Sequence, residues 1–334
     1  MTSHGVHLRR THENTAEIEA LAGRHGDPVG VAGVVRELNR SAGRVPVPGL
    51  AVEWGFRWND EDTESEGWWP QGITNSAHVP GVDRRLLVTS WYAKDDRGSR
   101  ITVVDLDSLR YRHVLLAVPS FDGPRIRLRP LTVHAGGLVW AGPFLYVAGT
   151  RRGLFTCRME DIVEVEPGAE TFGHRFVLPV RFGYDATHDD DQMRYSFLSL
   201  DRSSDVPHLV AGEYARDDMT RRIVRYPLDP DTHHLHSEEG GVSRPVSFDD
   251  RGIGHMQGAA IVGGRYYVTA SRGRWRLGAM HVGEPGAFRT YGRSMPVGPE
   301  DLCHWGDDDL LWSLSEYPGR RWVFCMKRSR FDQA

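Results

Sequence analysis

The sequence has few cysteines, no long apolar segment and no excess of basic charge. Its three cysteines, Cys157, Cys303 and Cys325, are an odd number without the spacing of a metal site, so we expect buried free thiols. No apolar run approaches the roughly 20 residues of a membrane-spanning helix. The net charge is −4 and the basic residues are scattered. Neither a membrane nor a nucleic acid is therefore an expected partner.

Several motifs that identify enzyme classes are missing. The chain has no G-x-S-x-G elbow, no G-x-G-x-x-G or P-loop after a strand, and no H-E-x-x-H zinc motif. These absences argue against an α/β-hydrolase, a dinucleotide-binding enzyme, a P-loop protein and a zinc protease. The first 23 residues also lack the apolar core of a secretory signal, so we expect a cytoplasmic location.

A repeated pattern organises what is present. The stretch HMQGAAIVGGRYYVTASRG reads as a strand, a two-glycine turn and a second strand. A third apolar segment follows each copy, and a fourth follows all copies except the last. Radial repetition of four-stranded units predicts an all-β protein with the fold of a five-bladed β-propeller. The five copies span 70–92, 134–153, 194–214, 255–273 and 299–319.

The N-terminal part is expected to complete the last blade and to cover one face of the propeller. Residues 51–58 can supply the strand that the last blade lacks, so that the two chain ends close the ring. The propeller would then span 51–334, preceded by a short helical extension over 1–50. Helical spacing over 15–22 and 29–43 predicts a cover on one face, with a pocket lid as the alternative. A two-sheet sandwich also has many short strands, but it gives no reason for the repetition.

The start of each innermost strand is the expected site, because these strands line a central channel whose mouth is concave. Five counterpart positions occupy these starts, and five more lie one pleat earlier. The first set is Gln71, Gly136, Tyr195, Gln257 and Glu300, and the second is Trp69, His134, Met193, His255 and Gly298. A further set lies near the ends of the second strands: Trp91, Glu213, Ser271 and Glu316. The sequence does not indicate which end of the channel these residues face.

The side chains of this ring suit acid/base chemistry. His134 and His255 could transfer protons near neutral pH, Glu300 could orient an imidazole or act as a base, and Tyr195 could donate to a developing oxyanion. The alternative is that these polar groups only satisfy backbone atoms in the channel. The residues expected to position and enclose a substrate are Trp68, Trp69, Gln71, Gln257, Asp301 and Trp305.

Acidic segments raise the question of a metal. Asp189, Asp190 and Asp191 precede an inner strand and could hold a calcium ion, the one cofactor considered. The segment 59–69, NDEDTESEGWW, lacks the ligand alternation of a calcium loop. We expect it to be a solvated loop.

The stretches PQGIT, HAGGLVW and HMQGAAI resemble strand openings of uncharacterised, usually secreted β-propeller proteins of actinobacteria. The resemblance implies a propeller fold and no particular activity, since propellers include lactonases, condensing enzymes, lyases, cyclases and lectins. The chain departs from these proteins in lacking a signal peptide.

The sequence therefore predicts an enzyme that binds a small or medium organic substrate in the channel mouth. Its acid/base chemistry would be a cyclisation, condensation or elimination in bacterial specialised metabolism, as in a cyclase or lyase. One alternative is a lectin-like carbohydrate-binding propeller. Another is a calcium-assisted lactonase or glycosidase.

Overall fold

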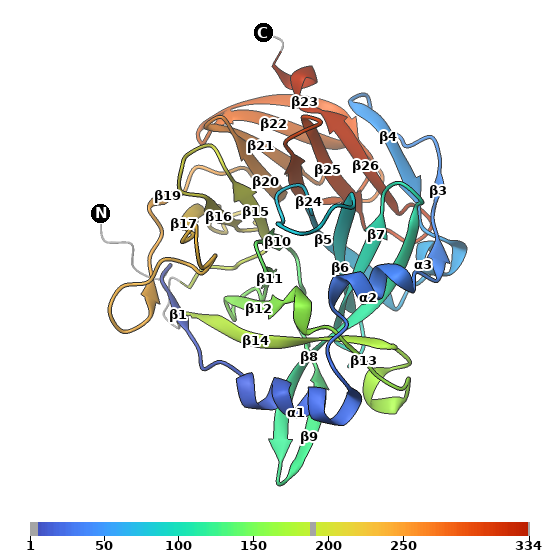
Figure 1. Ribbon diagram of the computed structural model, residues 1–334. Coiled ribbons are helices and arrows are strands. Elements are labelled where there is room, and N and C mark those ends of the chain that lie inside the picture. Colours follow the sequence, from blue (N-terminus) through green and yellow to red (C-terminus); the bar gives the residue numbers. More distant parts are fainter. Residues whose placement is uncertain (1–5, 188–191, 333–334) are drawn as a thin grey trace.

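The computed structural model describes residues 6–187 and 192–332, and it has an all-β, propeller-like fold (Figure 1). Most strands belong to five successive antiparallel runs of four. The first two runs are β5 (Trp68–Asn75), β6 (Leu86–Ala93), β7 (Ser99–Asp105), β8 (Arg110–Asp122), and β10 (Leu138–Ala141), β11 (Phe144–Ala148), β12 (Leu154–Arg158), β14 (Phe176–Ala186). The next two are β15 (Phe197–Asp201), β16 (His208–Gly212), β17 (Ile223–Pro227), β19 (Ser247–Asp249), and β20 (Met256–Val262), β21 (Arg265–Ala270), β22 (Gly278–Glu284), β23 (Ala287–Met295).

The last run joins the two ends of the chain. It consists of β24 (Pro299–Trp305), β25 (Leu310–Ser315), β26 (Trp322–Lys327) and β4 (Val52–Arg57). β4 pairs antiparallel with β26, so residues 51–58 take the place that the sequence predicts for them. β14 also pairs in parallel with β8, which merges the first two runs into one 13-stranded sheet. The number of blades therefore stays a prediction.

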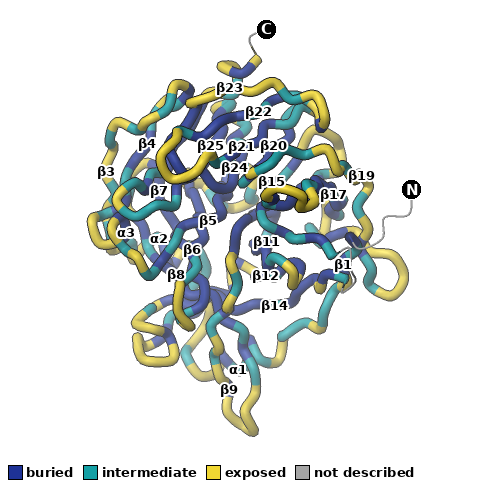
Figure 2. The backbone as a smooth tube through the Cα atoms, turned by 180° about the vertical axis from the view of Figure 1, so that it is seen from behind, coloured by how far each residue is buried: buried dark blue, intermediate teal, exposed yellow. Residues whose placement is uncertain are grey.

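The first strands of the runs form a closed ring of neighbours. β5 contacts β10, and the contacts continue through β15, β20 and β24 back to β5. Figure 2 shows these strands as largely buried, while many connecting loops at the periphery are exposed. The ring brings the starts of strands far apart in the sequence to one end of the molecule.

Glycines allow the inner strands to approach so closely. A Cβ atom on Gly258 would lie 2.5 Å from the amide nitrogen of Leu302, and one on Gly72 would lie 3.0 Å from the carbonyl carbon of Gly137. A Cβ on Gly137 would overlap the amide nitrogen of Leu198. Backbone packing between inner strands thus explains the glycine at the second position of the recurring Gln-Gly and Gly-Gly pairs.

Asp301 ties this ring together at its centre. Its side chain is fully buried, and Oδ2 accepts hydrogen bonds from the backbone amides of Ile73 (3.1 Å) and Leu138 (3.2 Å). These amides belong to β5 and β10, whereas Asp301 belongs to β24. One carboxyl group therefore bonds to backbone amides of two other inner strands. These amides would be costly to leave without a hydrogen-bond acceptor in the interior.

We expect Gly137→Ala to lower the free energy of unfolding by about 1–3 kcal/mol, because the added methyl group overpacks the inner ring. Gly23→Ala is the matched control. Gly23 lies in a helix with nothing within 4 Å of an added Cβ, so the same change should stabilise the protein by about 0.5–1 kcal/mol. Urea unfolding measures both, and equal stabilities of the two variants would contradict the role of Gly137.

The N-terminal segment runs along outer strands. β1 (Leu8–Arg10) pairs with β14 and with β18 (Val242–Ser243), and α1 (Thr15–His25) packs on β8, β9 (Arg125–Pro130), β13 (Val163–Glu164) and β14. α2 (Gly30–Arg36) contacts β7, β8 and η1 (Met159–Asp161). It is shorter than the 29–43 helix predicted, because β2 (Arg40–Ser41) and β3 (Gly43–Arg44) follow and pair with β8 and β4. None of the described helices is long and apolar enough to span a bilayer.

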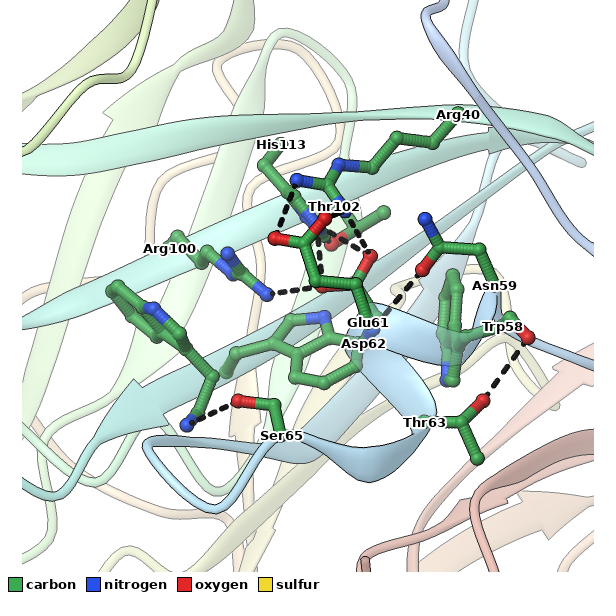
Figure 3. A network of polar contacts seen from close by, with 12 residues as sticks. Arg40, Trp58, Asn59, Glu61, Asp62, Thr63, Ser65, Arg100, Thr102 and His113 are labelled. Atoms are coloured by element: carbon green, nitrogen blue, oxygen red, sulfur yellow. Dashed lines mark hydrogen bonds and ion pairs between the residues drawn. The ribbon is translucent and has the colours of Figure 1, made fainter. Parts of the chain in front are cut away.

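The acidic segment 59–69 is not simply a solvated loop, which corrects the prediction. It contains α3 (Asp60–Glu64), and Asp62 on this helix is only 2% exposed. Figure 3 shows its carboxylate surrounded by cationic and polar side chains. The donors are Arg100 (2.9 Å), Arg40 (3.1 Å), Tyr111 (2.7 Å) and His113 (3.0 Å).

Hydrogen bonds keep Asp62 ionised in this interior. Burial opposes its charge, but His113, Arg100 and Tyr111 outweigh burial and hold the pKa of Asp62 well below its usual range. Burial, followed by the charge of Arg100, lowers the pKa of His113 to about 3. The neutral ring can donate from Nε2 to Asp62, while Nδ1 accepts from Thr102 at 2.7 Å. The network thus links α3 to β7 and β8.

Replacing Asp62 by Asn should lower the free energy of unfolding at pH 7 by about 3–5 kcal/mol, because the buried guanidinium group of Arg100 loses its anion. Asp60→Asn is the control in the same helix. Asp60 pairs with Arg57 but its side chain is 91% exposed, so we expect a change below about 1 kcal/mol.

The deficit of Asp62→Asn should depend on pH. Asp62 has a lower pKa in the folded than in the unfolded protein, so its contribution is complete above the ordinary pKa of 3.8 and is lost as the pH falls further. Urea unfolding should therefore give a stability difference between wild type and variant that shrinks below pH 3.8. A constant difference would show that the carboxylate charge is not what stabilises this network.

Candidate functional site

A cavity of about 850 Å³ lies at one end of the inner-strand ring. It is lined by the starts of β5, β20 and β24 and by loops that flank the inner and second strands. Its wall contains imidazole, carboxyl, amide, phenol and guanidinium groups, so it is the polar concave site expected of the channel mouth.

Five of the predicted site residues meet in this cavity. They are Gln71, His134, His255, Gln257 and Glu300. Ser271 and Glu316 also line it, which answers the question of the channel end for those two. The common location shows that the repeated strands do converge on one cavity, while the roles of the residues stay predictions.

Carboxyl groups form the buried side of the cavity. Glu300 is 4% exposed, and its Oε1 accepts a hydrogen bond from Gln257 Nε2 at 3.0 Å. Gln71 Nε2 donates to Glu316 Oε2 at 3.4 Å. Burial raises the pKa of Glu300 well above its usual range, and the neighbouring charges of Glu316 and Asp301 raise it further. The protonated form of Glu300 is therefore favoured over a wider pH range than in an exposed glutamate.

Glu316 differs from Glu300 in its partners. Burial also raises its pKa, but hydrogen bonds from Gln71 and Tyr317 and the charges of Lys94 and Arg321 oppose this effect. Two nearby carboxyl groups with unlike surroundings favour one protonated and one ionised partner, which is a common arrangement for acid and base.

The two imidazoles occupy different environments. The His134 ring lies 4.3 Å from the Tyr92 ring, at 31°. Burial lowers the pKa of His134, so that it is neutral at pH 7 and able to accept a proton. His255 Nδ1 lies 3.4 Å from the Tyr214 hydroxyl, which itself accepts from Arg216 Nε at 2.8 Å. The Tyr214 proton is then available to Nδ1, which leaves Nε2 of a neutral His255 as the donor.

The backbone at the imidazoles is held in unusual conformations. His255 has φ = 59° and Ala135, next to His134, has φ = 52°. Both are left-handed values that residues other than glycine rarely adopt, and such strain gathers at functional sites. The His255 backbone is fixed on both sides, by its amide to Ala215 O (2.8 Å) and by the Ser271 amide to its carbonyl (3.0 Å).

Tyr195 lies outside the cavity, which corrects its expected placement. It is fully buried, and its hydroxyl lies 2.9 Å from that of Tyr226. Ser196 lines the cavity in its place. The counterpart in the third copy is therefore one residue later than predicted, and a shift of one residue turns a strand side chain to the opposite face.

The predicted tryptophans do not line the cavity either. Trp68 is in the apolar core with Arg100 over its ring at 4.4 Å. Trp69 lies behind the wall, 6.2 Å from the Tyr317 ring and with Lys94 3.6 Å above its own ring. Trp305 is buried at the far end of β24 from Glu300. Asp301 faces the strand ring, as described above.

The calcium prediction falls on Asp189, Asp190 and Asp191, which lie outside the described residues. Within 6–187 and 192–332, no group of three or more His, Cys, Asp or Glu side chains is arranged to hold a metal ion. No cavity residue is therefore assigned to a metal.

Several cavity residues were missed from the sequence. The most prominent are arginines in loops outside the repeated strands: Arg194, Arg216, Arg272 and Arg276. Tyr214 and Tyr317, at the ends of second strands, also belong to the wall. The signal that could have found them is the run SRGRWR at 271–276, which follows a second strand directly.

No protein-family model and no curated protein sequence matches the chain. Among solved structures, the chain is similar to the gluconolactonase XC5397 from Xanthomonas campestris, at 15% identity over 86% of this chain and 89% of that one, with a TM-score of 0.37. It is similar to the β-propeller domain of Cps50 (Swd1) from Myceliophteria thermophila, at 10% identity over 84% and 99%, with a TM-score of 0.40.

A third similar structure is the GH43_1 enzyme from Xanthomonas citri in complex with xylotriose, at 12% identity over 93% of this chain and 92% of that one, with a TM-score of 0.38. Similarities this weak do not bear on activity. The strand pairing and the ring of inner strands are the evidence for the propeller-like fold.

Replacing Glu316 by Gln should lower the pKa of Glu300, because a negative charge that opposes its ionisation is removed. The pKa should stay above the usual range, since burial remains. A carboxyl-carbon NMR titration of glutamate-labelled protein measures the change. Glu238→Gln is the control, because this exposed side chain pairs with Arg244 away from the cavity. An unchanged Glu300 pKa in Glu316→Gln would contradict the coupling of the two carboxyl groups.

Proposed function

We propose that the protein is an enzyme that transfers protons to and from a small or medium organic molecule in this cavity. The observation that supports this proposal is a buried carboxyl group with a raised pKa, Glu300, in one cavity with an imidazole whose pKa is lowered, His134. We also propose that the five antiparallel runs are the five blades of a propeller, each contributing an inner strand to the ring.

The three groups take distinct roles. Glu300 donates a proton from Oε2, because Oε1 is held by Gln257. His134 accepts a proton, since its lowered pKa keeps it unprotonated. His255, with Nδ1 directed to Tyr214, offers its Nε2 hydrogen to a developing negative charge, the role that the sequence suggested for Tyr195. A general acid and a general base in one site suit a cyclisation, condensation or elimination.

Hydrolysis of a glycoside or a lactone is the second candidate. It is favoured by the pair Glu300 and Glu316, since glycosidases use two carboxyl groups of which one is protonated. A lectin-like propeller would need similar pockets on each run. The inner strands instead present unlike side chains, Gln71, Ser196, Gln257 and Glu300, to a single cavity.

Turnover should be followed by NMR on panels of aryl glycosides, lactones and unsaturated or hydroxylated acids. On a substrate so identified, Glu300→Gln and His134→Ala should each lower kcat by roughly 10²–10⁴-fold, the usual contribution of a general acid or base. His236→Ala, in an exposed loop, is the control. A folded His134→Ala/His255→Ala double variant with full turnover would refute the assignment.

The pH dependence of kcat separates the two groups. The rate should fall at acid pH as His134 gains a proton, below its ordinary value of 6.5, and at alkaline pH as Glu300 loses one. Glu300→Gln should remove the alkaline fall together with most of the rate. An alkaline limb that persists in this variant would assign the acid to another residue.

A further inference from the structure

The mouth of the cavity carries four arginines with little acidic compensation. Arg272 and Arg276 are exposed on the loop between β21 and β22, and neither forms an ion pair or hydrogen bond with any residue of the described chain. Arg216 is bonded to the Tyr214 hydroxyl rather than to a carboxylate. This concentration of positive charge is unfavourable unless something else compensates it.

Two partly buried arginines away from the cavity are paired with carboxylates. Arg181 is bonded to Asp161 at 2.7 Å and to Glu13 at 3.0 Å, and Arg225 lies 2.8 Å from Asp201. At the cavity, Arg194 shares Glu213 at 3.7 Å with Arg222, which is closer at 2.8 Å. Arg194 Nε is also buried without a partner among the described residues. The cavity mouth thus gathers the unpaired Arg272 and Arg276 and the unpartnered Nε of Arg194 around one concave site.

The loop that carries Arg272 and Arg276 is fixed to the reactive part of the site. The amide of Ser271 donates to the carbonyl of His255 at 3.0 Å, and Ser271 itself lines the cavity. An anion held by these arginines would lie on the same wall as the His255 imidazole. The cavity volume of about 850 Å³ leaves room for the rest of a small organic molecule.

We propose that the substrate carries an anionic group, a carboxylate or a phosphate, which Arg272 and Arg276 bind at the cavity mouth while its uncharged part reaches toward Glu300. The guanidinium group suits both anions because its N–H donors match two oxygens at once. Arg194 and Arg216 add positive potential on the opposite loops. This inference depends on the proposed function only in taking the bound molecule to be the substrate.

The test uses three probes of similar size on the full chain: phenyl phosphate, benzoate and the neutral benzyl alcohol. Binding is followed by the ring signal of His255 in histidine-labelled protein. Both anions should give saturable shifts, and benzyl alcohol should give none at the same concentrations. Arg272→Gln/Arg276→Gln should weaken anion binding roughly tenfold or more, since hydrogen bonds to charged groups are lost. The tighter of the two anions identifies the group preferred.

Arg125→Gln/Arg129→Gln is the matched control. These exposed arginines on β9 lie away from the cavity, so this variant has the same change in net charge and should bind both anions as wild type does. Near-UV circular dichroism verifies folding of each variant. Equal anion affinity in the wild type and in the mouth variant, or binding of benzyl alcohol as tight as that of the anions, would overturn the inference.

Failure of this inference and failure of the proposed function have different signatures. If anions bind through Arg272 and Arg276 but Glu300→Gln and His134→Ala leave turnover unchanged, the anion site stands and the acid/base assignment is wrong. If those two variants lose turnover while no anion binds at the mouth, the enzyme assignment stands and the substrate class is wrong.

Discussion

The structure depends on the close contact of its inner strands around one axis. Gly72, Gly137 and Gly258 permit this contact because side chains there would overlap the neighbouring backbone. Asp301 then satisfies amides of two strands that the contact leaves facing inward. The starts of β5, β20 and β24 are fixed as a consequence. Gln71, Gln257 and Glu300, near these starts, line the cavity.

The same central carboxylate influences the chemistry of the cavity. After burial, the charges of Glu316 and Asp301 raise the pKa of Glu300, so they oppose its ionisation. Burial raises the pKa of Asp301 well above its usual range, although the backbone amides that donate to it oppose this effect. Glu300 accepts from the side-chain amide of Gln257. The group that holds the ring together also raises the pKa of the neighbouring Glu300.

Much of this arrangement follows from the sequence, and the exceptions have physical causes. Apolar alternation and Gly-rich turns predicted the strands, and the repeat located Gln71, His134, His255, Gln257 and Glu300. The prediction for Tyr195 was wrong because the register of its copy is shifted by one residue, so that Ser196 lines the cavity. The prediction for Trp305 was wrong because this residue lies at the opposite end of β24 from Glu300. The sequence predicted a solvated Asp62 because its partners Arg100 and His113 are 38 and 51 residues away along the chain. The cavity arginines lie in loops outside the alternating strand segments, so strand periodicity could not place them.

In the proposed binding mode, the two parts of the cavity would act together on an anionic molecule. Glutamates on the buried side would repel an anion if they were ionised, with an energy that grows as water is excluded. Protonation of Glu300 would reduce this repulsion, and the arginines at the mouth would attract the charged end and leave the neutral end to face the acid. The proton that Glu300 would donate is thus also a condition for the molecule to enter. Binding and chemistry both depend on the environment that Asp301 and Glu316 create.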